Sequence, residues 1–182
     1  QSPPSSRRMV WLFALGLLVV PVAHAGKAHT HGVAQLKVSV EASQLSLAFE
    51  LPLDTLVGFE RAPRTPAETE AARVALARLR EATALVKPDA AAKCRLLGSQ
   101  VQAQVLEGPA KPGTERPAEP QHADASVSLT FECEQIAQLG SVELALFDSF
   151  RRLERVEAEM VTPKGQGKAT VRRAAKNLRL PR

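Results

Sequence analysis

The chain has 182 residues, of which 45% are hydrophobic and 24% charged, a composition typical of a globular domain and unlike that of a disordered or fibrous protein. Six Phe, one Trp and no Tyr are too few for the aromatic platforms that bind single-stranded nucleic acid or carbohydrate. The net charge of +5 is unevenly placed, because residues 163–182 hold seven Lys/Arg and no acid, whereas residues 26–162 hold 15 basic and 19 acidic side chains. We therefore expect a mildly acidic body with a basic C-terminal segment, and no binding to nucleic acid.

The first residues have the three parts of a secretory signal peptide. Two arginines at positions 7–8 precede an uncharged, mostly apolar run at residues 9–23, and an A-x-A cleavage site ends at Ala25. The run is shorter than the roughly 20 apolar residues of a spanning helix. We predict a signal peptide at residues 1–25, cleaved after Ala25, and an exported mature protein with no transmembrane span. The alternative is an uncleaved N-terminal anchor.

Export gives the two cysteines a structural meaning. Two cysteines in an oxidising compartment most often form one disulfide, so we predict a Cys94–Cys133 bridge. Closing a loop of about 40 residues stabilises a fold by roughly 4 kcal/mol in the chain-entropy model. The alternatives are a pair of thiolate metal ligands or a redox pair, which the lack of C-x-x-C spacing makes less favoured.

Two alternating runs open the mature chain. Residues 33–40 and 45–51 each place apolar side chains at every second position, with polar residues 41–43 between them, and so predict a β-hairpin with one buried face. Pro52 ends the second strand, because proline cannot donate to a ladder. A loop at residues 53–63 follows.

The next segment predicts a helix. Thr65 stands at the N-cap, Pro66 at the first helical position and Glu68 at N3, which together form a capping box. Pro88 ends the helical pattern. The apolar stripe of this helix consists of Ala72, Ala75, Leu76, Leu79, Ala82 and Val86.

Four further alternating runs predict strands, at residues 101–105, 125–133, 142–146 and 153–161. A loop with four prolines separates the first two, at residues 107–121. The fold class that follows is α+β, with a mainly antiparallel sheet of about six or seven strands and one long helix packed on it. We assign residues 26–162 to this single domain and residues 163–182 to a basic tail or an edge strand.

Histidines stand immediately before two of the predicted strands. His29 and His31 are two residues apart, a spacing that puts both imidazoles on one face of an extended chain, and His122 precedes the strand at 125–133 together with Asp124. If that strand pairs beside the first, the three imidazoles and the carboxylate form one set. Such ligands suit zinc, and copper(II) or nickel are allowed by the same donors. The alternative is that these imidazoles are simply solvated.

No enzyme motif is present. The sequence has no glycine-rich phosphate loop, no H-E-x-x-H, no C-x-x-C and no nucleophile elbow. Nothing marks a catalytic triad among its Ser, His and Asp residues. We therefore predict no catalytic residues and no enzymatic activity.

Six short motifs in order resemble the ZrgA-like periplasmic proteins, also described as domain of unknown function 2796. The motifs span residues 29–150 and the resemblance extends to about residue 167. They are His29-x-His31-Gly32-x-Ala34-x-Leu36, Leu56-Val57-Gly58-Phe59-Glu60-x-Ala62-Pro63, Cys94, His122-Ala123-Asp124, Phe131-x-Cys133 and Leu146-Phe147-Asp148-x-Phe150.

The resemblance implies an exported, non-enzymatic protein that is associated in some members with zinc binding, zinc-dependent regulation and a zinc uptake system. Two departures remove potential ligands. Many relatives have a histidine-rich stretch where residues 107–121 have none, and many have histidine where this chain has Arg61. The histidines that remain, His29, His31 and His122, fall on positions that look like the family's histidine positions.

The first hypothesis is a periplasmic zinc-binding accessory protein that delivers metal to a membrane importer. Its ligands would be His29, His31 and His122, with Asp124 or Glu60 as a fourth ligand or as a group that orients one. The second hypothesis is a metal-free periplasmic module that docks a partner through a sheet edge or through the basic tail. Loss of metal binding in histidine variants separates the two.

Overall fold

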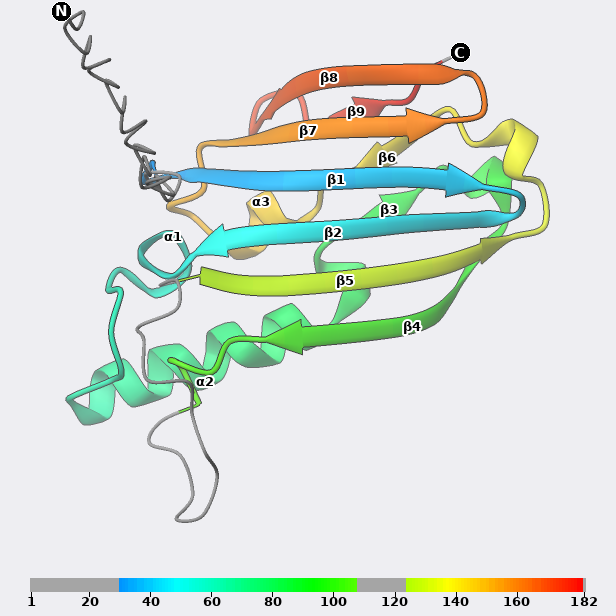
Figure 1. The fold of residues 1–182 in the computed structure, drawn as a ribbon. Coiled ribbons are helices and arrows are strands. Elements are labelled where there is room, and N and C mark those ends of the chain that lie inside the picture. Colours follow the sequence, from blue (N-terminus) through cyan, green and yellow to red (C-terminus); the bar gives the residue numbers. More distant parts are fainter. Residues whose placement is uncertain (1–29, 108–123, 182) are drawn as a thin grey trace, which may run out of the picture.

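The computed structural model describes residues 30–107 and 124–181. A six-stranded sheet dominates this part of the chain, in the order β4-β5-β2-β1-β7-β8 (Figure 1). Neighbouring strands are antiparallel except β1 and β7, which are parallel, so the sheet is mixed and mainly antiparallel. The strands are β1 (Val33–Glu41), β2 (Gln44–Pro52), β4 (Cys94–Gln102), β5 (Asp124–Cys133), β7 (Arg155–Thr162) and β8 (Gly165–Arg172).

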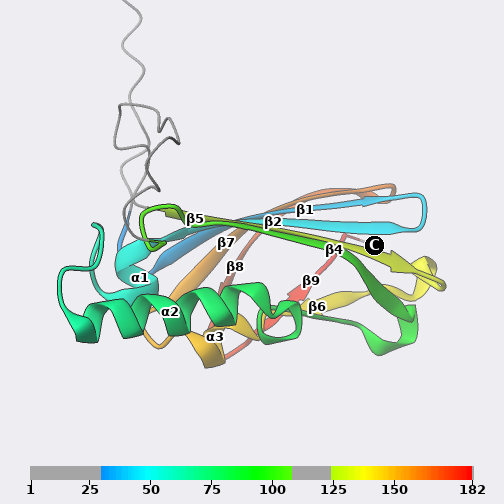
Figure 2. The ribbon, with the colours of Figure 1, turned by 90° about the horizontal axis from the view of Figure 1, so that it is seen from below.

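The remaining elements form a second layer. Figure 2 shows the α-helices and strands of a small three-stranded sheet on one face of the main sheet. Among the described residues, no helix has the length and apolar character that crossing a membrane requires. The elements of this layer and its connections are α1 (Leu53–Val57), α2 (Pro66–Arg80), α3 (Leu146–Ser149), the 3₁₀ turns η1 (Ala82–Ala84), η2 (Ala90–Ala92) and η3 (Ile136–Gln138), and the strands β3 (Lys87–Pro88), β6 (Ser141–Glu143) and β9 (Asn177–Arg179).

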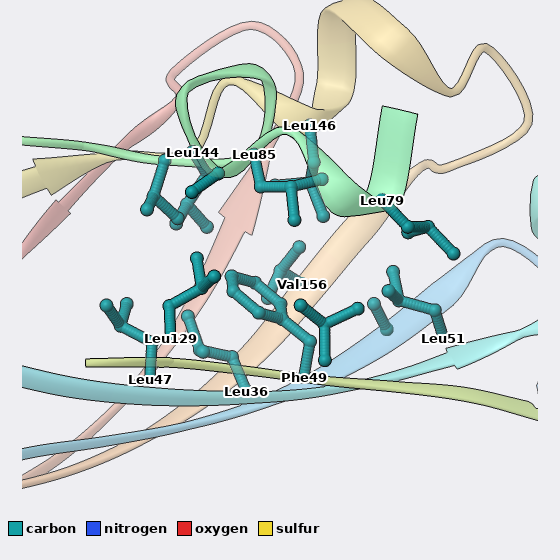
Figure 3. Close-up of a cluster of buried hydrophobic side chains, with 14 of the residues drawn as sticks. Leu36, Leu47, Phe49, Leu51, Leu79, Leu85, Leu129, Leu144, Leu146 and Val156 are labelled. Atoms are coloured by element: carbon teal, nitrogen blue, oxygen red, sulfur yellow. The ribbon is translucent and has the colours of Figure 1, made fainter. Parts of the chain in front are cut away.

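The core lies between the two layers. Side chains from the inner face of the main sheet, such as Leu36, Phe49 and Leu129, meet leucines of the second layer, such as Leu79 and Leu146 (Figure 3). All five are at most 1% exposed. Burying a side chain of this kind contributes about 1.5–3 kcal/mol relative to leaving it in water. The alternation of buried residues with exposed or half-buried ones along β2, β5 and β7 is therefore the main reason why the centre of this sheet forms.

The predicted helix corresponds to α2 but ends earlier than the pattern indicated. The Thr65 hydroxyl accepts a hydrogen bond from the Glu68 main-chain N–H at 3.2 Å, as expected of an N-cap. The helix ends at Arg80, and η1 follows it. Ala82 and Val86 are buried, as the apolar stripe predicted, but they lie outside the helix because they fill the core from η1 and the chain after it.

Several predicted strands are shifted or replaced. The strand predicted at 101–105 is the end of β4, which begins at Cys94, and the chain turns after Gln102. The strand predicted at 142–146 is shorter, because β6 ends at Glu143 and α3 begins at Leu146. The basic C-terminal segment contributes an edge strand, β8, and the short β9. Alternation predicts a strand but not its length, which depends on whether a neighbouring strand is there to pair with.

The pairing of β5 also differs from the arrangement that the histidine hypothesis considered. β5 lies beside β2, not beside β1, and the pairing runs from Gln44 opposite Glu132 to Pro52 opposite Asp124. On its other side β5 pairs with β4, where Cys94 stands directly opposite Cys133. The two cysteines form a disulfide with an S–S distance of 2.04 Å, in agreement with the sequence-based prediction. The predicted signal peptide and residues 108–121 of the predicted loop lie outside the described residues.

Candidate metal centre

The candidate ligand residues that the structure describes lie at one end of the main sheet. β1 begins, β2 ends and β5 begins at this end, and α1 follows β2 directly (Figure 1). A residue before β1 and residues after β2 are therefore close in space although they are more than 20 positions apart in the sequence.

A tight turn carries His31 into this region. Gly32 has a positive φ of +75°, a conformation that glycine adopts without steric cost, and its N–H donates a hydrogen bond to the Thr55 hydroxyl at 3.1 Å. Thr55 is only 1% exposed. This buried hydrogen bond ties the turn before β1 to α1, and so fixes the position of His31 relative to that helix.

The helix α1 supplies the first carboxylate, and the chain after it supplies the second. Asp54 lies in the first turn of α1. The helix ends at Gly58, which has a left-handed φ of +88° and whose N–H donates to the Asp54 carbonyl oxygen at 2.8 Å. The left-handed C-cap turns the chain, and Glu60 is two residues further on.

These elements bring three ligand-type side chains together. The Nδ1 atom of His31 is hydrogen-bonded to Oδ2 of Asp54 and lies 3.9 Å from Oε1 of Glu60. The potential ligand atoms of the three residues all lie within 4.8 Å of one another. The side chains are 74%, 19% and 45% exposed for His31, Asp54 and Glu60 respectively. The cluster is thus open to solvent on the histidine side and is backed by the less exposed carboxylate of Asp54.

The charges in the cluster favour a cation. The pKa of His31 is raised above its ordinary value, mainly by the hydrogen bond to Asp54, then by the charge of that carboxylate and, to a smaller degree, by the charge of Glu60. The same carboxylates attract a metal ion, which must displace the proton from the imidazole before it can bind there. Proton and metal therefore compete for one nitrogen.

The structure brings together only part of the predicted ligand set. His31 and Glu60 meet, as the hypothesis requires. Asp124 begins β5 at the same end of the sheet but is not part of the cluster that the described residues form. His29 and His122 lie outside the described residues.

Sequence reasoning missed Asp54. The available signal was its position two residues after Pro52, which ends the second strand of a hairpin. Because the two strands of a hairpin are antiparallel, the residues after the second strand return to the residues before the first. This rule would have placed Asp54 near His31.

Arg61, directly after Glu60, is turned toward α2. Its guanidinium donates two hydrogen bonds to the Glu68 carboxylate, at 2.8 and 2.9 Å, and lies 5.4 Å from the centre of the Phe59 ring. The paired carboxylate raises the pKa of Arg61. The residue thus anchors the loop after Glu60 rather than adding a ligand.

A comparison with protein-family models matches residues 28–180 to the ZrgA family zinc uptake protein model. The chain belongs to the ZrgA family. A search of curated proteins finds no match. The matched range covers every strand of both sheets as well as the three residues of the cluster, so the family assignment applies to the whole described fold.

The donor set of the cluster fits the metal in the family's description. One imidazole nitrogen and two carboxylate oxygens are common zinc ligands, which bind at about 2.0–2.2 Å. Closing the cluster onto an ion requires only small side-chain movements, because its ligand atoms already lie within 4.8 Å of one another. Copper(II) and nickel accept the same nitrogen and oxygen donors.

Proposed function

We propose that this chain is an exported periplasmic protein that binds zinc through His31, Asp54 and Glu60 and serves zinc uptake as an accessory to a membrane importer. The observation that carries the proposal is the convergence of these three side chains at one end of the sheet. The match to a family of zinc uptake proteins supports zinc as the ion. Export is supported by the signal-peptide pattern of residues 1–25.

We propose His29 and His122 as further ligands, because each is close in sequence to a residue at this end of the sheet. His29 is two positions from His31, and His122 is two positions from Asp124. Asp124 itself lies opposite Pro52, just before α1. Either imidazole is proposed as an alternative nitrogen ligand in place of one carboxylate, which keeps one position of a four-coordinate zinc ion open.

The openness of the site suits transfer of an ion rather than catalysis. His31 is 74% exposed, so an incoming ligand from another protein can reach an ion bound there. Structural zinc sites are closed by four protein ligands, whereas an exposed site with a free position exchanges its ion readily. We accordingly propose a carrier role with no enzymatic activity.

Zinc titration by calorimetry tests the proposal. The protein from Gly26 onward is titrated at pH 7.5, beside His31→Ala, Asp54→Asn and Glu60→Gln variants. Each variant is expected to bind zinc at least tenfold more weakly, since even groups that only orient a ligand cost about 10–100-fold when they are removed. Asp148→Asn is the matched control, because Asp148 also lies in the first turn of a short helix but pairs with Lys176.

The opposite result would favour the second hypothesis. A protein that releases no heat with zinc, copper(II) or nickel would not be a metal carrier. Docking through a sheet edge would then be the better reading, and β4 offers such an edge, with Leu96 and Leu97 both 44% exposed. Zinc binding that all three variants retain would show that the ion is held elsewhere in the chain.

A further inference from the structure

The turn before β7 packs against both segments that carry the metal cluster. The main-chain N–H groups of Glu154 and Arg155 donate to the Gly32 carbonyl oxygen, at 2.8 and 3.1 Å. Gly32 immediately follows His31 in the chain. The side chain of Arg152, in the same turn, reaches the other segment at Gly58, between Asp54 and Glu60.

The contact between Arg152 and Gly58 is close and face-on. A Cβ atom placed on Gly58 would lie 2.9 Å from Nη2, 3.0 Å from Cζ and 3.2 Å from Nε of Arg152. Because these three distances are nearly equal, the flat face of the guanidinium lies against the glycine. The N–H donors of a guanidinium lie in its plane, so this stacking leaves its donor edge available.

The stacked guanidinium has no anionic partner in the part of the chain that the structure describes. Arg152 is exposed, and no hydrogen bond or ion pair of its side chain occurs among those residues. By contrast, the nearby Arg155 pairs with Glu157 at 3.2 Å, and Arg61 pairs with Glu68. An unpaired Arg152 guanidinium beside the proposed metal site lowers the affinity for a metal ion, because like charges repel. An anion that binds to both the guanidinium and the metal ion would offset this repulsion.

We propose that Arg152 and the metal centre form one composite site for a carboxylate: one carboxylate oxygen binds the metal held by His31, Asp54 and Glu60, and the other accepts hydrogen bonds from Arg152. This inference rests on the proposed zinc site. Guanidinium and carboxylate match in geometry, and three protein ligands leave a position open on zinc. The carboxylate comes from a small organic acid or from an acidic side chain of the protein that receives the ion.

The positive charges of Arg152 and of the bound metal ion predict an effect on zinc affinity that differs from the effect of a misfolded variant. Without a carboxylate, Arg152 weakens zinc binding through repulsion; with one, it strengthens binding through the bridging anion. In chloride buffer, Arg152→Gln should therefore bind zinc about three- to eightfold more tightly than the unaltered protein. This is the effect expected when one unit charge several ångströms from the zinc ion is removed in a solvent-exposed site. In acetate, this advantage should disappear.

The experiment measures zinc affinity against a competing chelator in chloride and in acetate buffers of equal ionic strength. Arg151→Gln is the matched control, because Arg151 is the adjacent exposed arginine, whereas the atoms nearest to the Cβ position of Gly58 all belong to Arg152. The unaltered protein and Arg151→Gln are expected to bind zinc several-fold more tightly in acetate than in chloride, and Arg152→Gln is expected to lose this dependence. In the zinc-loaded protein, acetate should also shift the Nε–H resonance of Arg152.

The outcomes separate the two proposals. If the unaltered protein binds zinc but both arginine variants respond to acetate alike, the composite site is wrong and the zinc site stands. If the unaltered protein binds no zinc in either buffer, both proposals fail. A short glutamate-containing peptide, compared with acetate at equal carboxylate concentration, identifies the source: stronger enhancement by the peptide indicates a partner protein, and equal enhancement indicates a free organic acid.

Discussion

Arg173, directly after β8, holds together the chain segment that precedes β7. Its guanidinium donates hydrogen bonds to the main-chain carbonyl oxygens of Phe147, Phe150, Arg151 and Leu153; the last three accept from Nη2 at 3.0, 3.0 and 2.9 Å. The guanidinium carbon also lies 5.8 Å from the centre of the Phe147 ring. One side chain thus joins α3, the following turn and the end of β8.

The cost of removing this side chain follows from its donors. Nη2 has two hydrogens, which are shared among three carbonyl groups, and Nη1 supplies one more hydrogen bond, so the network is equivalent to about three full hydrogen bonds. Each contributes about 0.5–1.5 kcal/mol net, and we take about 1 kcal/mol for each, because Arg173 is exposed and water competes for its donors. Arg173→Ala is therefore expected to lower the free energy of unfolding by about 3 kcal/mol, which corresponds to a fall in Tm of about 6–12 °C for a domain of this size.

Urea unfolding followed by circular dichroism measures this effect. Arg172→Ala is the matched control, because Arg172 is the neighbouring exposed arginine, and a surface substitution of this kind changes stability by about 0.5 kcal/mol at most. Arg173→Lys should recover only part of the loss, since one ammonium group cannot reach carbonyl groups on both sides. Equal stability of Arg173→Ala and Arg172→Ala would refute the network argument.

Three further predictions concern the cluster and the frame around it. Gly58→Ala should destabilise the fold by about 1–2 kcal/mol in urea unfolding, because its φ of +88° penalises any Cβ and the Arg152 guanidinium occupies the space. Replacing both Cys94 and Cys133 by alanine should cost about 4 kcal/mol, the loop-closure term for a separation of 39 residues. Arg61 and the Arg64 main-chain N–H lower the pKa of Glu68 to about 2, so the stability advantage of the unaltered protein over Glu68→Gln should be complete above pH 4.5 and vanish as the pH falls toward 2.

Each of these predictions has a distinct contradicting result. Gly165→Ala shares a positive φ of +141° but has open space around it, so an equal effect at Gly58 and Gly165 would show that the Arg152 contact costs nothing. A reduced protein that unfolds at the same urea concentration as the oxidised one would contradict the loop-closure estimate. A Glu68→Gln difference that is constant between pH 7 and pH 2 would show that the ion pair with Arg61 does not form in solution.

Local patterns in the sequence were sufficient for the elements with strong periodicity. The alternation in β1, β2 and β5 and the Thr65 N-cap of α2 depend on contacts a few residues apart, and the structure has all four. His31 and Glu60 were recognised as candidate ligands from their residue types and motif positions.

The tertiary structure alone decided which distant segments meet. β1 pairs in parallel with β7, more than 100 residues later in the sequence, and β5 lies beside β2 rather than β1. Arg152 came to lie on Gly58 because β7 pairs with β1, whereas Asp54 meets His31 through the local β1–β2 hairpin. The physical reason is that alternation records which face of a strand is buried, whereas the choice of a neighbouring strand depends on the summed packing of side chains across the whole core, which no local segment of the sequence contains.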